Sequence, residues 1–335
     1  SAASDVYKRQ QILLTGEYTI DGTRDTGFDL NGYCIKGTVT VKAAASNHTT
    51  TFSNTQNTTT ASIDAVVAHR GAKLAGSGSP AVIGTLTLAE GATWKNILND
   101  TALGYKVLNA DGTHKWYARD DVNGSQLNNV IINRLPITTK TLNLKVDGKN
   151  LTGNSPKVER GTTVQLCASC NAKDVTVEFS ILKKGETTPI TLTKPSYADR
   201  KYTKDYSFDT IGEYTIYFTA TKDGYTVTSR PKTLSVTKAA IPASAITAPA
   251  ANALTYNGSE QALVTAGKTT GGTMLYRLGD SEWSEHIPTA KNAGKYTVWY
   301  KVQGDAEYAD VAEQSLTVTA AKKAVTVTAL DKNAH

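Results

Sequence analysis

The stretch that decides the fold reads GKYTVWYK and covers residues 294–301. Within it Tyr296, Val298 and Tyr300 alternate with residues that point to the opposite side. Alternation with a period of two, in a segment rich in β-branched and aromatic residues, predicts a β-strand with one buried face. A second stretch, GEYTIYFT at residues 212–219, starts 82 residues earlier and keeps the same alternation. The two stretches predict two copies of one β-rich unit.

Each copy is followed by a closing strand whose first residue, Leu234 or Leu316, lies 22 positions after the glycine. A glycine two residues before the first tyrosine favours a sharp turn into the strand. This arrangement resembles the tyrosine corner of strand F in an immunoglobulin-like sandwich, whose hydroxyl bonds back to the backbone. Ile216 and Val298 stand where antibody-type domains carry a cysteine, so no disulfide between sheets is expected. The alternative is an unrelated antiparallel strand that begins with tyrosine.

Length and charge bound the organisation of the chain. Its 335 residues exceed one typical domain and predict two or three. The formal net charge is +6, and residues 141–240 carry 15 basic and 10 acidic side chains. The lysines there alternate with acidic residues, which favours a solvated face over a nucleic-acid site. No apolar run approaches the roughly 18 residues of a membrane helix, so no membrane span is expected.

Both ends of the sequence differ from an ordinary domain. Residues 1–10, SAASDVYKRQ, resemble a translated sequencing-adapter read-through from a metagenomic gene fragment, which implies a non-native segment. Residues 324–332, AVTVTALDK, read as the opening strand of a further unit that is cut short at His335. No signal peptide is recognisable. We therefore expect a fragment of a longer protein.

Residues 11–136 carry short alternating runs separated by Gly or Asn turns. Short strands with small corner residues predict a β-solenoid, whose rungs bury apolar side chains by stacking. The segments FDLNGYCI (28–35) and GTLTLAEGA (84–92) resemble rungs of right-handed parallel β-helices in bacterial surface proteins, and LGYKVLNADGT (103–113) resembles their terminal hairpin. Residues 43–62 are open to two interpretations, a loop or further rungs. The resemblance implies the C-terminal part of a longer solenoid.

Two further units follow a boundary at Pro136, because proline ends strand pairing. Residues 137–239 hold seven apparent strands, the last predicted over residues 226–236, which fits an immunoglobulin-like count. Residues 240–321 contain LTYNGSEQALV (254–264) and AGKYTV (293–298), which resemble the Ig-like, MBG-related repeats of bacterial cell-surface proteins. That resemblance implies a tandem array on an exported protein and assigns no catalytic residue.

The expected fold is therefore all-β: a partial β-solenoid, the end of a right-handed β-helix, followed by tandem immunoglobulin-like β-sandwiches. The expected divisions are a non-native segment at 1–10, the solenoid at 11–136, two sandwiches at 137–239 and 240–321, and the start of another repeat at 322–335.

The three cysteines are too few for a disulfide scaffold. Cys34 stands alone, and Cys167 and Cys170 form a C-x-x-C motif. A structural zinc site needs four ligands, and no second motif completes one. A thioredoxin-like pair would open a helix, whereas the residues around this motif alternate as a strand. We expect unpaired or locally bonded cysteines at a strand end.

The five histidines have no ligand spacing, so solvated or capping roles are expected, with no metal and no cofactor. They are His48, His69, His114, His286 and His335.

Two pairs of acids are the candidates for glycosidic chemistry, which requires paired carboxyl groups. Asp25 and Asp29 would share a face if both lay in one strand, and Asp120 and Asp121 are adjacent. Polysaccharide lyases and hydrolases with a β-helix fold use acidic residues on rung faces. Aspartate is also an ordinary turn residue, and the flanks of both pairs read as turns. We expect turn roles and no catalytic residue.

Aromatic side chains offer the other candidates for binding. Trp299 and Tyr217 project from the outer face of the two matching strands, and Trp283, Trp94 and Trp116 lie near loops. Carbohydrate and protein ligands dock on such rings. The preferred interpretation is partial burial against a neighbouring unit, and no binding residue is assigned.

The preferred hypothesis is a non-enzymatic, monomeric fragment of an exported bacterial surface protein. Its modules would serve as spacers or as adhesive units for a surface glycan or an extracellular protein. The alternative is the accessory portion of an extracellular polysaccharide lyase or glycosidase with a β-helix catalytic domain.

Overall fold

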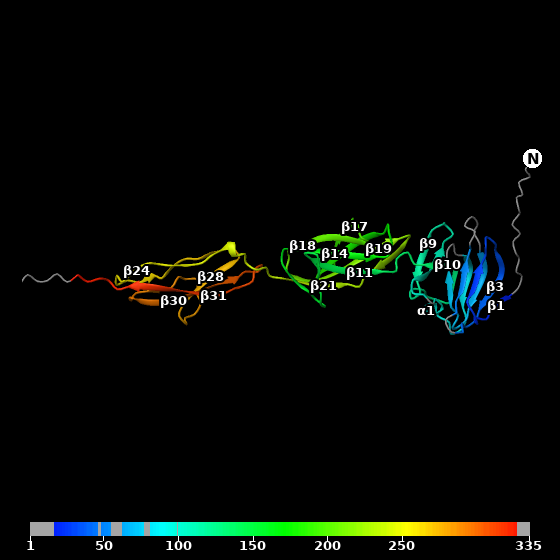
Figure 1. Cartoon of the computed structure of the whole chain (residues 1–335), viewed down its shortest axis with the longest axis horizontal. Coiled ribbons are helices and arrows are strands. Elements are labelled where there is room, and N and C mark those ends of the chain that lie inside the picture. The colour runs from blue at the N-terminus through cyan, green and yellow to red at the C-terminus, as the bar shows by residue number, and fades with distance from the viewer. Residues whose placement is uncertain (1–16, 46–47, 55–61, 77–80, 99, 327–335) are drawn as a thin grey trace, which may run out of the picture.

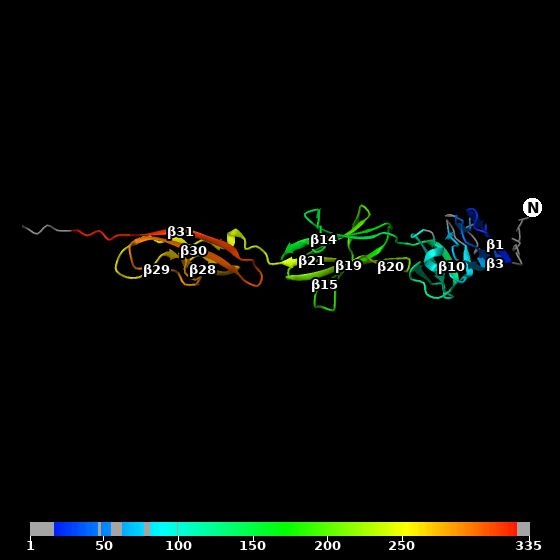
Figure 2. The ribbon, with the colours of Figure 1, turned by 90° about the horizontal axis from the view of Figure 1, so that it is seen from below.

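The computed structural model describes residues 17–326 except 46–47, 55–61, 77–80 and 99, so the expected non-native segment 1–10 and His335 lie outside the described residues. Three hydrophobic cores follow one another along an elongated molecule (Figure 1). We call the regions around them unit 1, with a core from Ile20 to Ile132, unit 2, from Ile137 to Val236, and unit 3, from Ile241 to Val318. Figure 2 shows the same row of units after a quarter turn.

Unit 1 winds between two parallel sheets. One contains β1 (Glu17–Ile20), β3 (Ile35–Val41), β5 (Ser62–Ala68) and β7 (Val82–Leu88), and the other contains β2 (Thr26–Asp29), β4 (Thr50–Ser53) and β6 (Leu74–Gly76). Successive strands enter the two sheets alternately, and neighbours pair in parallel, with one register shift between Ile35 and Thr38 in the β3–β5 pair. Apolar side chains therefore stack on one another, as Val39, Val66 and Leu86 do at full burial.

Antiparallel strands continue the larger sheet of unit 1. β10 (Gln126–Arg134) pairs with β7 and with β8 (Leu103–Leu108), which forms a hairpin with β9 (His114–Ala118). The hairpin predicted from residues 103–113 is confirmed. β4 lies within residues 43–62, so this stretch is not entirely a loop. Helix α1 (Trp94–Ile97) buries Trp94 and Ile97 beside the core.

Unit 2 is a sandwich of two sheets. Its strands are β11 (Lys140–Val146), β12 (Lys149–Asn150), β13 (Lys157–Glu159), β14 (Thr162–Cys170), β15 (Thr176–Lys183), β16 (Ile190–Leu192), β17 (Ser196–Ala198), β18 (Lys201–Phe208), β19 (Gly212–Lys222), β20 (Tyr225–Thr228) and β21 (Lys232–Thr237). The order β11-β14-β18-β17 in one sheet and β15-β19-β21 in the other matches the ABED and CFG sheets of an immunoglobulin-like sandwich.

The single strand predicted over residues 226–236 is wrong, because the chain forms β20 and β21 there. Ser229 lies between them and is buried, and its hydroxyl accepts a hydrogen bond from the Phe218 N–H at 3.0 Å. Pro231 follows and has no N–H to donate to a ladder. The short strands β12, β13 and β17 were not predicted.

Unit 3 repeats the half of the sandwich that contains the tyrosine strand. Its strands are β22 (Ile246–Thr247), β23 (Ala250–Ala251), β24 (Leu254–Thr255), β25 (Gln261–Ala262), β26 (Val264–Thr265), β27 (Lys268–Thr269), β28 (Gly272–Leu278), β29 (Thr289–Ala290), β30 (Gly294–Gly304) and β31 (Val311–Ala321), with a 3-10 helix at Ala243–Ala245. β30 lies between β28 and β31, as β19 lies between β15 and β21. In unit 2 the short strand β13 pairs in parallel with the last strand, β21, and in unit 3 the short strand β24 pairs in parallel with the last strand, β31.

The two tyrosine corners are confirmed. The hydroxyl of Tyr214 donates to the carbonyl of Thr210, and that of Tyr296 donates to the carbonyl of Asn292, each at 2.7 Å. The equal sequence spacing of the closing strands nevertheless hides a difference in register. Leu234 lies opposite Tyr214, whereas Leu316 lies two residues further along its partner strand. β19 runs on to pair with β20, whereas β30 pairs with β31 alone on that side and accommodates a bulge.

Candidate functional site

The linker between units 2 and 3 is paired with unit 3 through its backbone. The N–H of Ala239 donates to the carbonyl of Glu307 at 3.0 Å, and its carbonyl accepts from the Ala309 N–H at 2.9 Å. The ammonium group of Lys238 donates to the carbonyl of Asp305 in the same loop. We call this region, residues 238–241 with Glu159, Arg160 and the loop 304–310, the 2–3 joint.

Two side chains of unit 2 complete the 2–3 joint. A carboxylate oxygen of Glu159 accepts from the Ala240 N–H at 3.1 Å. The Arg160 Nη2 lies 2.8 Å from the Glu307 Oε2, and its guanidinium lies 6.0 Å from the centre of the Tyr308 ring. Backbone pairing, a charged pair and a ring contact therefore act together, which restricts rotation of one unit against the next.

A second joint connects units 1 and 2. The Nε2 of His114 lies 2.8 Å from the carbonyl oxygen of Asp223, in the turn between β19 and β20. Just after this joint, within unit 2, the side-chain oxygen of Asn171 accepts from the N–H groups of Thr138 and Thr139, at 2.7 and 2.9 Å. His114 was expected to be solvated or capping, and its contact with unit 2 was missed. No sequence signal could have found it, because the partner is a backbone carbonyl 109 positions away.

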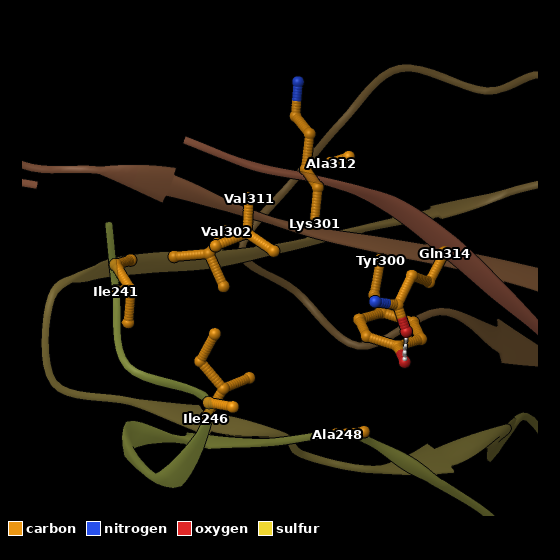
Figure 3. Close-up of a pocket in the computed structure, with 10 residues that line it drawn as sticks. Ile241, Ile246, Ala248, Tyr300, Lys301, Val302, Val311, Ala312 and Gln314 are labelled. Carbon is orange, nitrogen blue, oxygen red and sulfur yellow. Dashed lines mark hydrogen bonds between the residues drawn. The ribbon is translucent and has the colours of Figure 1, made fainter. Parts of the chain in front are cut away.

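An apolar groove of about 340 Å³ opens beside the 2–3 joint in unit 3 (Figure 3). The hydroxyl of Tyr300 donates to the side-chain oxygen of Gln314 at 2.7 Å, so these two polar groups satisfy each other. Lys301 extends away from the groove. The groove therefore offers contacts mainly for apolar side chains. Its aliphatic lining consists of Ile241, Ala243, Ile246, Ala248, Val302, Val311 and Ala312.

The tryptophans of unit 3 are covered by cations of the same unit. The guanidinium of Arg277 lies 5.2 Å from the ring centre of Trp299 and 4.8 Å from that of Trp283. The Lys301 Nζ lies 4.6 Å from the Trp283 ring centre, and the Arg277 Nη2 lies 3.2 Å from the Glu313 Oε2. Trp299 is half-buried as expected, but by Arg277 and not by a neighbouring unit. These rings stabilise the outer face through cation–π contacts.

The tryptophans of unit 1 belong to its interior. Trp94 is buried in α1, its N–H donates to the carbonyl of Gly124 at 2.7 Å, and its ring meets Tyr105 edge to face at 5.2 Å. Trp116 on β9 is buried as well. Neither ring is placed to receive a ligand. Sequence reasoning placed both near loops, because the contacts of Trp94 with Tyr105 and Gly124 depend on packing that the sequence does not state.

Cys167 and Cys170 carry free thiols on β14, as expected for this motif. Cys167 and Cys170 lie on opposite faces of β14, because three positions separate them, so their thiols do not face each other. The thiol of Cys167 donates weakly to the Gln165 side chain at 3.5 Å, and Cys34 accepts from the Ser62 hydroxyl at 3.3 Å. Burial raises the pKa of the Cys167 thiol, and that of Cys170 to about 11. Both thiols of this motif are therefore protonated at neutral pH and unsuited to redox attack.

The raised pKa of Cys170 predicts that unit 2 loses stability in alkali. A raised folded-state pKa contributes stability that is present below the unfolded value, about 8.5, and is lost as the pH rises through the folded value of about 11. The urea midpoint for unfolding of unit 2 should fall as the pH rises across this range, and it should fall less in the Cys170→Ala variant. Cys34→Ala in unit 1 is the control and should leave it unchanged. A wild-type midpoint that does not move with pH would contradict the prediction.

The histidines form no metal site in the part of the chain that the structure describes, and no group of three His, Cys, Asp or Glu there could hold an ion. The Nδ1 of His48 lies 3.6 Å from a carboxylate oxygen of Asp25, and that of His286 lies 3.1 Å from the Ser284 hydroxyl. His69 is exposed.

Within the same described ranges, no helix has the length and hydropathy needed to cross a membrane.

The first pair of candidate acids does not share a strand, so the condition for a shared face is not met. Asp25 precedes β2, and its carboxylate accepts from the Thr49 N–H at 2.8 Å. Asp29 ends β2 and accepts from the Asn31 N–H at 3.1 Å. Each carboxylate holds a backbone turn or crossing, which is the turn role expected of aspartate.

The second pair of candidate acids, Asp120 and Asp121, lies in the turn between β9 and β10. A carboxylate oxygen of Asp120 lies 3.5 Å from the Lys95 Nζ. The expected turn position is confirmed, and the structure does not place this pair beside Asp25 or Asp29.

Comparisons with known proteins give structural likenesses alone. No family model and no curated protein matches the chain. Among solved structures, E. coli alpha-2-macroglobulin in its native conformation is similar at 10% identity and a TM-score of 0.25, over 67% of this chain and 22% of that one. An I-band fragment of titin is similar at 12% identity and a TM-score of 0.26, over 66% of this chain and 88% of that one. Tandem Ig domains of titin are similar at 16% identity and a TM-score of 0.20, over 55% of this chain and 100% of that one. This chain thus spans about a fifth of the alpha-2-macroglobulin chain.

Proposed function

We propose that the chain is a non-enzymatic stalk of an exported bacterial surface protein, whose tandem β-units space and present weakly adhesive surfaces to a glycan or an extracellular protein. The observation that carries this proposal is the 2–3 joint, where Ala239 is paired on both sides with the loop of unit 3. A linker held in this way fixes the direction in which the next unit continues. Three separate cores in a row support the same function.

The proposal includes the division of the chain into a solenoid end at 11–136, sandwiches at 137–239 and 240–321, and the beginning of another repeat at 322–335. The alternation of strands between two parallel sheets in unit 1, with its stacked apolar residues, supports a β-solenoid. The antiparallel β10 and the β8–β9 hairpin support its termination there.

The stalk function predicts a stiff rod in solution. Replacing Arg160 and Glu307 together by alanine removes the ion pair of the 2–3 joint, and we expect faster amide hydrogen exchange in residues 238–241 and a smaller radius of gyration in small-angle X-ray scattering. The matched control replaces Lys184 and Glu213 by alanine, an exposed ion pair of unit 2 outside the joint, and should change neither readout.

Two results would overturn the proposal. The stalk function would be wrong if small-angle X-ray scattering of the wild-type chain fitted freely jointed units and the linker amides exchanged as fast as in an unfolded peptide. Cleavage of a polysaccharide by the purified chain in a lyase or glycosidase assay would remove the non-enzymatic part. A glycan-array screen tests the adhesive part independently.

A further inference from the structure

The far end of unit 3 repeats the arrangement with which unit 2 holds unit 3. In unit 2 the N–H of Arg160, just after β13, donates to the carbonyl of Thr237 at 2.9 Å. In unit 3 the N–H of Tyr256, just after β24, donates to the carbonyl of Ala321 at 2.8 Å. Tyr256 therefore stands where Arg160 stands, at the end that leads out of the unit.

The residues that leave each unit correspond in the same register. Lys238 corresponds to Lys322 and Ile241 to Val325, because Thr237 and Ala321 are equivalent. Ile241 is 8% exposed in the core of unit 3, whereas Val325 is 82% exposed, and Tyr256 is 39% exposed. Among the described residues, Tyr256 and Val325 are the exposed large hydrophobic side chains of unit 3. Both lie at positions whose counterparts contact the next unit.

A hollow of about 400 Å³ lies at this end of unit 3. In the 2–3 joint the corresponding lysine, Lys238, meets the loop 304–310, which carries three acidic residues. Lys322 and Lys323 offer two positive charges at the far end, which suits a loop of the same acidic kind. We call this surface the end face of unit 3, and its lining residues are Tyr256, Asn292, Ala293, Lys322, Lys323 and Val325.

We propose that the end face of unit 3 docks a further β-sandwich module of the unit 3 kind, which meets it through an acidic loop equivalent to residues 304–310. This inference rests on the proposed stalk function and adds the surface and the chemistry of the contact. A second copy of this chain is not the occupant, because its loop 304–310 is already covered by its own Ala239 and Arg160. The occupant is a module joined in line, with Val325 buried as Ile241 is buried.

A fusion tests this docking directly. Residues 242–321 are joined directly after Val325, in place of residues 326–335, so that a second copy of unit 3 follows the end face as unit 3 follows unit 2. Hydrogen exchange of residues 238–241 and 322–325 is then measured in the same molecule. We expect residues 322–325 to exchange about tenfold or more slowly than in the unfused chain. Val325→Asp in the fusion should restore fast exchange, and Ile190→Asp, a matched change of an exposed apolar residue on unit 2, should not.

The two joints separate the possible failures. Slow exchange at residues 238–241 with fast exchange at residues 322–325 in the fusion overturns the docking inference and leaves the stalk function standing. Fast exchange at both places shows that the stalk function itself is wrong. Protection that survives Val325→Asp also overturns the inference, because the contact then does not use the end face.

Discussion

Phe218→Ala is expected to lower the free energy of unfolding of unit 2 by about 3–5 kcal/mol. The ring is fully buried on β19 and meets Phe179 of β15 edge to face, with 6.1 Å between ring centres. Truncation removes this contact and leaves a cavity that a close-packed sandwich cannot fill. Because the three cores share no residue, the transitions of units 1 and 3 should stay where they are.

Calorimetry of the whole chain checks this result, since each unit contributes its own transition. Tyr217→Ala is the matched control: it removes the neighbouring aromatic ring on the opposite face of β19, which is half-buried. We expect it to cost less than about 1.5 kcal/mol. A uniform shift of all transitions in Phe218→Ala would mean that the units unfold as one body, which would contradict their independence.

Gly76→Ala is expected to destabilise unit 1 by about 3 kcal/mol or more. A Cβ at this position in β6 would lie 1.6 Å from the carbonyl oxygen of Ile132 in β10, so the two strands would have to separate. The backbone at Ile132 is held in the sheet by its neighbours and has little freedom to move. The cost arises from this close approach, since β6 carries no left-handed backbone at Gly76.

Gly27→Ala is the control for this substitution. Gly27 lies in β2, in the same small sheet, and a Cβ there would meet no atom within 4 Å. We expect a change below about 1 kcal/mol, because alanine replaces glycine without a clash. Urea unfolding followed by far-ultraviolet circular dichroism distinguishes the two variants. Equal midpoints would show that β6 and β10 do not approach as closely as described.

Much of the strand pattern could be predicted, because it depends on neighbours along the chain. The alternation in residues 212–219 and 294–301 requires only that one face be buried, and both segments are strands with that face inward. The tyrosine corners are equally local, since hydroxyl and carbonyl are four residues apart. The break between β20 and β21 was missed although Pro231 is a local signal for it, whereas the contact of Ser229 with the backbone of Phe218 could not be predicted from neighbours along the chain.

Almost nothing of the candidate site could be predicted. Arg160 and Glu307 are far apart in sequence, and no periodicity or motif links them. Aromatic residues were visible as candidates, but the cations that cover Trp283 and Trp299 come from neighbouring strands whose register the sequence does not state. The acidic pairs were candidates for a catalytic site only because residues close in the sequence were taken to be close in space.

The sequence by itself determined that this chain is built from β-strands, that two of its segments open with the same tyrosine corner, and that neither cysteines nor histidines are spaced for a metal site. These properties follow from side-chain alternation and from bonds between residues a few positions apart. Only the tertiary structure decided how the units are joined and which end of unit 3 carries uncovered apolar and basic residues. Such contacts bring together residues far apart in the chain, and their free energy depends on geometry that exists only after the sheets have paired and packed.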